Sequence, residues 1–233
     1  MTNRIVTKGI VLSRTDFNEA DRILTFLTAD HGKIRAIAKG VRKQKSRLAG
    51  GIELFSVSDL TFLKGRSEIN TLISSRLQKH YAHIVKNLDR TNTGYDFIKL
   101  INRATEDAAE AGYFNLLKGG FRALDDDSIG LNLTRVWFSS QLLKLAGHTP
   151  NLHTDVAGQK LASGQKYDFN FDAMCFQASQ SGRGAFGADQ IKFLRLIFSN
   201  NRLSTLQKVQ QADKLAGQTQ PLLQAMLKMF IRL

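Results

Sequence analysis

The sequence predicts an α+β protein in which a small barrel of five strands is followed by a helical domain. Residues 8–77 divide into short β-type segments separated by turn residues, a spacing typical of small barrels and sandwiches. From Tyr81 onward the apolar residues recur every three or four positions, which is the period of an amphipathic helix. This change of period predicts two domains, 1–80 and 81–233, and a polar stretch at about 148–187 predicts a loop or small hairpin inserted in the second.

The five predicted strands lie in the first domain and are separated by turn signals. They are Lys8–Ser13, Arg22–Thr28, Lys33–Ala38, Leu54–Leu63 and Glu68–Leu77. Residues 30–32 predict a tight hairpin turn between the second and third strands, and residues 64–67 predict a turn between the last two. In the third strand apolar residues alternate with Lys33 and Arg35, which places both cations on the face opposite the core. Five strands in about 70 residues suit an OB-type barrel.

The second domain contains several helical patterns with recognisable ends. Its first apolar positions at helical spacing are Ile84, Leu88, Phe97, Ile101, Leu133 and Trp137. Residues 125–128, Asp-Asp-Asp-Ser, predict the start of the longest helix, because carboxylates complement the exposed N–H groups of a helix N-terminus. Residues 147–150, Gly-His-Thr-Pro, predict its end. Two or three helices close the chain, at Ala188–Ser199, Thr205–Leu215 and Pro221–Arg232.

The composition indicates an anionic partner and a reducing environment. Among 233 residues, 33 are Lys or Arg and 20 are Asp or Glu, which gives a formal net charge of +13. The single cysteine, Cys175, has no partner for an internal disulfide, as expected of a cytoplasmic protein. No window approaches the roughly 18 apolar residues of a membrane span, and the N-terminus lacks the apolar region of a secretory signal. We therefore expect a soluble protein that is not exported.

The most informative feature is a run of basic residues on the third predicted strand and the loop after it. No acidic residue occurs between Asp30 and Glu53, whereas seven basic residues do. They are Lys33, Arg35, Lys39, Arg42, Lys43, Lys45 and Arg47. A solvated surface would explain such a run on a neutral protein. On a barrel of a type that binds oligonucleotides, in a strongly basic chain, it predicts nucleic-acid binding with little sequence preference. Phe17 is the one candidate in this domain for stacking on a base.

Other motifs do not predict catalysis, a cofactor or a metal. Residues 182–187 match the glycine pattern of dinucleotide-binding proteins, but the second strand with an acidic end is missing, so a loop is expected. Three adjacent aspartates, residues 125–127, favour helix capping over a two-metal nuclease site, because catalytic carboxylates normally converge from separate elements. His148, His153 and Cys175 are too few for a structural zinc site. No residue has the context of an activated nucleophile.

Several segments resemble bacterial RecO in order and spacing. The N-terminal ones are Gly9–Leu12, Asn18–Arg22, His31–Lys33, Ala38–Arg42 and Ser46–Leu48, and the helical ones are Gly112–Leu117 and Leu145–Pro150. The resemblance implies a recombination mediator without catalysis, built from an OB domain and a helical domain. It also implies binding of single- and double-stranded DNA, annealing of complementary strands, and cooperation with RecR to load RecA onto DNA coated by single-strand-binding protein.

The resemblance assigns roles to only some residues. It places the basic OB surface at Lys39, Arg42 and the neighbouring Lys43, Lys45 and Arg47, and a site for the tail of single-strand-binding protein in the helical part. Many members carry a four-cysteine zinc site after the Gly-His-Thr-Pro turn, and here residues 152–158 lack the first cysteine pair. A zinc-finger-like insertion without its cysteines is therefore expected. The charge pattern alone also allows an alternative function, that of an RNA-binding or ribosome-associated OB protein. If the protein is a recombination mediator, it is expected in the cytoplasm, at the nucleoid.

Overall fold

The chain folds into two compact units, residues 1–126 and 127–233. The computed structural model describes residues 3–65, 68–105, 111–199 and 202–231. The first unit contains the predicted five-stranded barrel and the first two helices, and the second is mainly helical with a small sheet, which confirms the predicted α+β class. The predicted domain boundary at residue 80 stays a prediction. No helix in the described ranges combines the length and apolar character that crossing a membrane requires.

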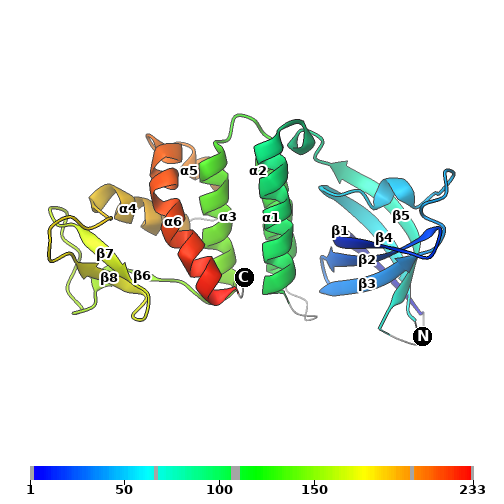
Figure 1. Ribbon diagram of the computed structural model, residues 1–233, viewed down its shortest axis with the longest axis horizontal. Coiled ribbons are helices and arrows are strands. Elements are labelled where there is room, and N and C mark those ends of the chain that lie inside the picture. Colours follow the sequence, from blue (N-terminus) through cyan, green and yellow to red (C-terminus); the bar gives the residue numbers. More distant parts are fainter. Residues whose placement is uncertain (1–2, 66–67, 106–110, 200–201, 232–233) are drawn as a thin grey trace. The chain divides into compact units, whose positions relative to one another are not determined.

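The barrel is closed and has the strand order β1-β2-β3-β5-β4 (Figure 1). Its strands are β1 Arg4–Phe17, β2 Asp21–Thr28, β3 Lys33–Ala38, β4 Ser56–Leu63 and β5 Asn70–His80, with a 3-10 turn, η1, at Ala49–Gly51. Neighbouring strands are antiparallel except β3 and β5, which pair in parallel. All five predicted strands are confirmed, and the predicted turn at 30–32 is closed by Thr28 N–H donating to the Gly32 carbonyl at 2.8 Å. Arg66 and Ser67 of the other predicted turn lie outside the described residues.

The barrel interior is filled by alternate residues of each strand, as a pleated strand with one buried face requires. In β3 the apolar residues Ile34, Ala36 and Ala38 are buried while Arg35 is exposed. The rings of Phe26 and Phe62 meet edge to face, with centroids 5.4 Å apart. These contacts form a packed core that gives the basic segment a rigid base.

Two helices complete the first unit: α1, Leu88–Ala104, preceded by a 3-10 turn, η2, at Ile84–Lys86, and α2, Ala111–Leu124. They pack against each other and join the barrel through Phe55. Phe55 is buried and packs edge to face on Tyr95 of α1 and Phe121 of α2, with centroids 5.3 and 5.5 Å away. Gly94 permits this approach, because a Cβ there would lie 2.6 Å from the Phe55 ring.

A buried arginine closes the carboxyl end of α2. Arg90 of α1 is 8% exposed, and its Nη1 donates to the carbonyls of Ala123, Leu124 and Asp126 at 3.4, 3.0 and 3.1 Å. The last carbonyls of a helix have no partner within the helix, so a cation placed there supplies donors and complements the helix dipole. Arg90 therefore ties α1 to the end of α2.

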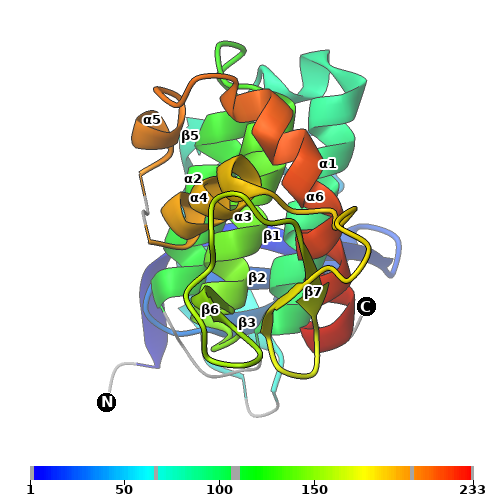
Figure 2. The ribbon, with the colours of Figure 1, turned by 90° about the vertical axis from the view of Figure 1, so that its left-hand side faces the viewer.

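The second unit is built on a pair of packed helices, α3 and α6 (Figures 1 and 2). Its elements are α3 Leu131–Leu145, β6 Asn151–Asp155, β7 Tyr167–Asn170, β8 Cys175–Ala178, α4 Ala188–Ser199, α5 Leu203–Leu206 and α6 Ala212–Phe230. The helix predicted at 188–199 is confirmed. Residues 221–230 are helical as predicted, but they belong to one helix, α6, that starts at Ala212 and runs through Pro221. The predicted division into two helices, 205–215 and 221–232, is therefore wrong. Arg232 lies outside the described residues.

Burial explains why α6 continues through Pro221. A proline inside a helix costs about 3 kcal/mol and usually ends it. Here the buried positions before and after it lie on one face: Ala212, Ala216, Thr219, Leu222, Leu223, Met226 and Leu227. Packing of this continuous face against α3 offsets the local cost, since burying one Leu or Met side chain contributes about 1.5–3 kcal/mol.

The start of α3 differs from the prediction. Its N-cap residue is Gly130, two positions after the predicted segment 125–128, and a glycine has no side chain with which to cap the helix. The carboxylate comes instead from α6: Asp213 Oδ1 accepts from Leu133 N–H at 2.9 Å, and Oδ2 accepts from the Asn132 amide at 3.0 Å. A Cβ at position 130 would collide with this carboxylate, so glycine is required there. Asp125 caps elsewhere, accepting from His83 N–H at 2.8 Å.

Replacing Asp213 by Ala is expected to destabilise the second unit by about 1–2 kcal/mol, the usual value of a lost N-cap side chain. The single tryptophan, Trp137, lies in α3, so its fluorescence during urea unfolding reports on this unit. The neighbouring Lys214 is exposed and provides the control Lys214→Ala, which should change stability by less than about 0.5 kcal/mol. Equal midpoints for Asp213→Ala and the wild type would contradict the capping role.

The end of α3 is as predicted. Gly147 has a φ of +82°, in the left-handed region that glycine adopts at helix ends. His148 N–H donates to the Leu143 carbonyl at 2.8 Å and Gly147 N–H to the Lys144 carbonyl at 3.1 Å, the bonding pattern of a Schellman motif. The chain then enters a three-stranded sheet, β6-β8-β7. The predicted hairpin corresponds to β7 and β8, whereas β6, which pairs in parallel with β8, was not predicted.

Candidate nucleic-acid interface

Residues 39–47, the basic loop, leave the barrel at the end of β3 and are held to it by backbone contacts. Val41 is 4% exposed and belongs to the barrel core. Arg42 N–H donates to the Ala20 carbonyl at 2.9 Å, and Gly40 N–H donates to Asp21 Oδ1 at 2.7 Å. These contacts join the loop to the turn between β1 and β2 and to the first residue of β2. The backbone of the loop is therefore positioned by the barrel, and its long side chains project from a fixed base.

The chain after the basic loop is attached to β5. The Leu48 carbonyl accepts from Ser75 Oγ at 2.8 Å, and Leu48 itself packs against the barrel core. Gly51, in η1, is buried against β5, and a Cβ there would lie only 2.5 Å from the Ser75 side chain. Glycine is thus needed at this position for close packing. The loop is anchored at both ends.

Five of the seven predicted site residues present free charges. They are Arg35, Lys39, Lys43, Lys45 and Arg47. All five are exposed, and within the described part of the chain none forms an ion pair or a side-chain hydrogen bond. A solvated face on an ordinary protein alternates charge signs, which limits repulsion. Cations left without carboxylates produce a positive potential that attracts a polyanion.

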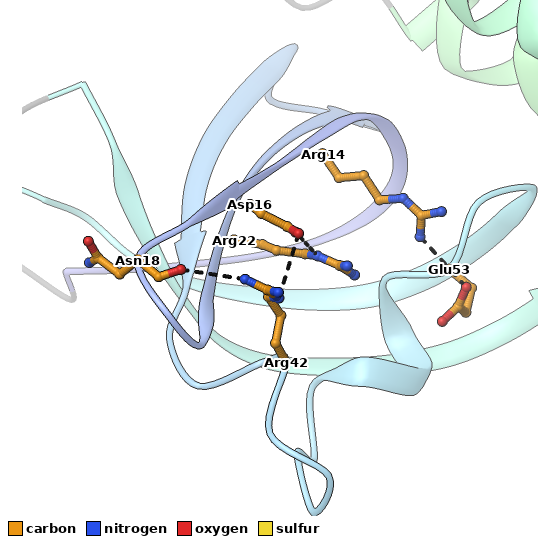
Figure 3. Close-up of polar contacts among 6 residues, drawn as sticks. All are labelled: Arg14, Asp16, Asn18, Arg22, Arg42 and Glu53. Carbon is orange, nitrogen blue, oxygen red and sulfur yellow. Dashed lines mark hydrogen bonds and ion pairs between the residues drawn. The ribbon is translucent and has the colours of Figure 1, made fainter.

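The other two predicted site residues have partners within the protein. Lys33 is half-buried, and its Nζ donates to the Asn102 carbonyl near the end of α1 at 2.7 Å. Its charge therefore helps to hold the helix against the barrel. Arg42 is 38% exposed; its Nε lies 3.6 Å from Asp16 Oδ2, and its Nη1 donates to the Asn18 carbonyl at 3.5 Å (Figure 3).

Two further arginines, which sequence reasoning missed, lie beside Arg42. Arg22 Nε donates to Asp16 Oδ1 at 2.6 Å, and Arg14 Nη1 lies 3.9 Å from Glu53 Oε2 (Figure 3). The hydrogen bond from Arg22 lowers the pKa of the Asp16 carboxyl, and the charges of Arg42 and Arg14 act in the same direction. A search for runs of like charge passes over Arg14 and Arg22 because acidic residues separate them. Strand pairing could have found them, since a β1–β2 hairpin places Asp16 opposite Arg22.

An exposed sheet face adjoins the basic loop. The register of β1, β2 and β3 aligns Thr15 with Ile23 and Ile37, one row nearer to the loop than Arg35. Both isoleucines are half-buried, and Phe17 at the end of β1 is 42% exposed. The corresponding face and β1–β2 loop of other OB barrels bind oligonucleotides. Phe17 is therefore available for stacking, whereas Phe26, Phe55 and Phe62 are buried, as expected.

The small sheet of the second unit does not fit a zinc ion. In the ranges that the structure describes, no three His, Cys, Asp or Glu side chains are grouped so that they could hold a metal, and this includes the aspartates at 125–127. Burial raises the pKa of the Cys175 thiol, which disfavours the thiolate that binds zinc. The centre of the sheet is aromatic instead: Phe176 packs against Tyr167, Phe169 and Phe186, with centroids 5.4–6.2 Å away.

The glycine-rich segment 182–187 serves the same sheet. Phe186 and Tyr167 exchange backbone hydrogen bonds of 2.9 and 3.0 Å, which fix the segment alongside β7. A Cβ on Gly184 would lie 2.6 Å from the Tyr167 carbonyl oxygen. Close packing against the Tyr167 backbone therefore explains why residue 184 is a glycine, without the phosphate contact that the dinucleotide-binding pattern would imply.

Comparison with known proteins identifies both parts of the chain. The family model for the recombination protein O N-terminal region matches residues 1–81, and the model for its C-terminal region matches residues 86–231. Curated proteins named DNA repair protein RecO are similar. The one from Dehalococcoides mccartyi is 33% identical over 147 residues, 63% of this chain and 57% of the relative. The one from Bifidobacterium longum subsp. infantis is 35% identical over 151 residues, which are 64% of this chain and 63% of the relative. The matched part thus spans less than two thirds of these relatives.

Proposed function

Because the chain belongs to the recombination protein O family, we propose that it is a recombination mediator in DNA repair that binds DNA and catalyses no reaction. The observation that carries this proposal is a set of five exposed cations on an anchored loop and strand of the OB barrel, none of which has a partner among the residues that the structure describes. The name of its relatives, DNA repair protein, points to the same role. Both family models and the barrel topology support it.

The proposed mechanism is electrostatic. Each phosphate that Lys or Arg neutralises releases condensed counterions, so affinity depends on the number of contacts and falls as salt rises. Backbone contacts of this kind position a strand and read little sequence. A protein that neutralises two complementary strands at one surface lowers the repulsion between them, which favours annealing. The half-buried isoleucines and Phe17 beside the loop offer an apolar face for unpaired bases.

We further propose the partners and the division of labour that the family implies. In this scheme residues 1–80 bind single- and double-stranded DNA, and residues 81–233 recruit the acidic tail of single-strand-binding protein. With RecR, the protein would then help to load RecA onto the coated strand. The place of action in this proposal is the cytoplasm, at the nucleoid.

Annealing of complementary oligonucleotides is the direct test. The purified chain should accelerate pairing of two labelled strands, naked or precoated with single-strand-binding protein, and the acceleration should fade as salt rises. In the same buffers, RNA of equal length serves as a competitor, and labelled DNA with Mg²⁺ or Mn²⁺ tests for cleavage. Unchanged annealing rates would contradict the mediator role. Tighter binding of RNA would favour the RNA-binding alternative, and degraded DNA would favour a nuclease.

A further inference from the structure

Two arginines contact one carboxylate at the end of the barrel, and a third lies nearby with its guanidinium turned toward Glu53 (Figure 3). Arg14 lies on β1, Arg22 on β2 and Arg42 in the basic loop, and the carboxylate belongs to Asp16 of β1. Arg22 contacts Asp16 at 2.6 Å and Arg42 at 3.6 Å, and the charge of Arg14 acts on the same group. The three side chains are 37%, 30% and 38% exposed, so solvent and ligands can reach them.

The barrel builds this cluster in two ways. Antiparallel pairing of β1 with β2 sets Asp16 opposite Arg22, and it sets Arg14 two positions earlier on the same face. The backbone bond from Arg42 to the Ala20 carbonyl then holds the loop over the β1–β2 turn. The backbone positions of the three arginines thus follow from strand register and from a loop anchored in the core. Neither depends on the Asp16 ion pair itself.

We propose that Arg14, Arg22 and Arg42 form a phosphate-binding site for the nucleic-acid backbone, and that Asp16 occupies it until a phosphate displaces its carboxylate. This inference rests on the proposed DNA binding and extends it to residues outside the basic loop. Guanidinium groups bind carboxylates and phosphates with the same planar, bidentate geometry, so one anion can replace the other. A phosphodiester and a terminal phosphate both supply this chemistry.

The energetics allow the exchange. The Asp16 side chain is 52% exposed, and exposed ion pairs contribute little to stability because water and salt screen them. Glu53 pairs with Arg14 across 3.9 Å, and within the described part of the chain it forms no other ion pair. A phosphate on the DNA backbone is linked to neighbouring phosphates, which the cations at Lys43, Lys45 and Arg47 can contact at the same time. The Asp16 carboxylate brings no such additional contacts. The nucleic acid therefore gains from several simultaneous contacts, and Asp16 acts as a built-in competitor that lowers its affinity.

The expected effect of Asp16→Asn is tighter binding of single-stranded DNA, by about three- to tenfold at low salt. Glu19→Gln is the matched control. Glu19 is an exposed carboxylate in the turn that follows β1. It forms no ion pair within the described residues, and its replacement changes the net charge equally. In an Arg22→Gln/Arg42→Gln background, Asp16→Asn should bring no gain, because the site that it frees is gone. Circular dichroism of each variant checks the fold.

The outcomes separate this inference from the proposed function. If the wild-type chain binds no DNA even in dilute buffer, the proposed function itself fails. If the wild type binds, and Asp16→Asn behaves like Glu19→Gln or keeps its gain without Arg22 and Arg42, the phosphate site is overturned. Oligonucleotides with and without a 5′-phosphate identify the source. If Asp16→Asn increases affinity equally for both oligonucleotides, the site binds an internal phosphodiester. If it increases affinity only for the phosphorylated strand, the site binds a terminal phosphate.

Discussion

Replacement of Lys43, Lys45 and Arg47 by Glu should weaken single-stranded DNA binding by at least about a hundredfold at low salt. The three side chains are exposed and, within the described residues, unpaired, so each is free to contact a phosphate. Reversal removes these contacts and adds repulsion at the same positions. The plot of log affinity against log salt should become shallower by about two to three units, since each lost contact removes roughly one.

Fluorescence anisotropy across a salt series measures both quantities. The control is the triple replacement of Lys160, Lys166 and Arg183 by Glu, which changes the net charge equally at exposed positions in the segments beside the strands of the small sheet. It should lower affinity far less. An equal loss in the two triple variants would show that overall charge, and not the basic loop, determines binding. Arg42 stays unchanged in this design because Asp16 already engages it.

Replacement of Arg90 by Met should destabilise the first unit by about 3–5 kcal/mol. Methionine preserves most of the buried volume but supplies no donor, so the carbonyls of Ala123, Leu124 and Asp126 lose the partner that Arg90 provides. Buried acceptors without donors carry their full desolvation cost, and the end of α2 also loses a charge that complements its dipole. This is among the larger effects expected of one substitution.

Urea unfolding followed by circular dichroism measures this effect, while Trp137 fluorescence monitors the second unit separately. Arg122→Met is the control, since Arg122 is exposed on the same helix and its replacement should change stability by less than about 0.5 kcal/mol. If Arg90→Met unfolds with the wild-type midpoint, the buried arginine has no stabilising role. At temperatures where the variant is folded, DNA affinity should match the wild type, because Arg90 lies outside the basic loop.

The two halves of the candidate interface differ in how far the sequence revealed them. The basic loop was predictable because its charges are contiguous and because strands on both sides show the alternation of a half-buried barrel. The arginine cluster was not, because Arg14 and Arg22 are adjacent to Asp16 only after β1 and β2 pair. Lys33 illustrates the converse. It belongs to the same basic run, yet its ammonium group donates a hydrogen bond to the Asn102 carbonyl near the end of α1.

Helix ends show the same limit. Gly147 could be identified from sequence because a left-handed residue at a helix end is a local requirement that glycine meets at least cost. The cap of α3 could not, because its carboxylate comes from Asp213, 80 residues away from the amide it accepts from. The continuity of α6 through Pro221 was equally hidden, since the burial that favours it depends on the partner helix α3.

By itself the sequence determined the α+β class, the five strands of the barrel and the position of the cationic loop. These features follow from local periodicity, from turn residues and from the order of charged residues along the chain. Each of these signals involves only a few neighbouring residues, so the sequence shows it directly. The tertiary structure alone decided which cations stay free, which pair with carboxylates and which support helices. Those outcomes depend on distances between side chains that are remote in sequence. These distances are set only when the strands pair in register and the helices pack against each other.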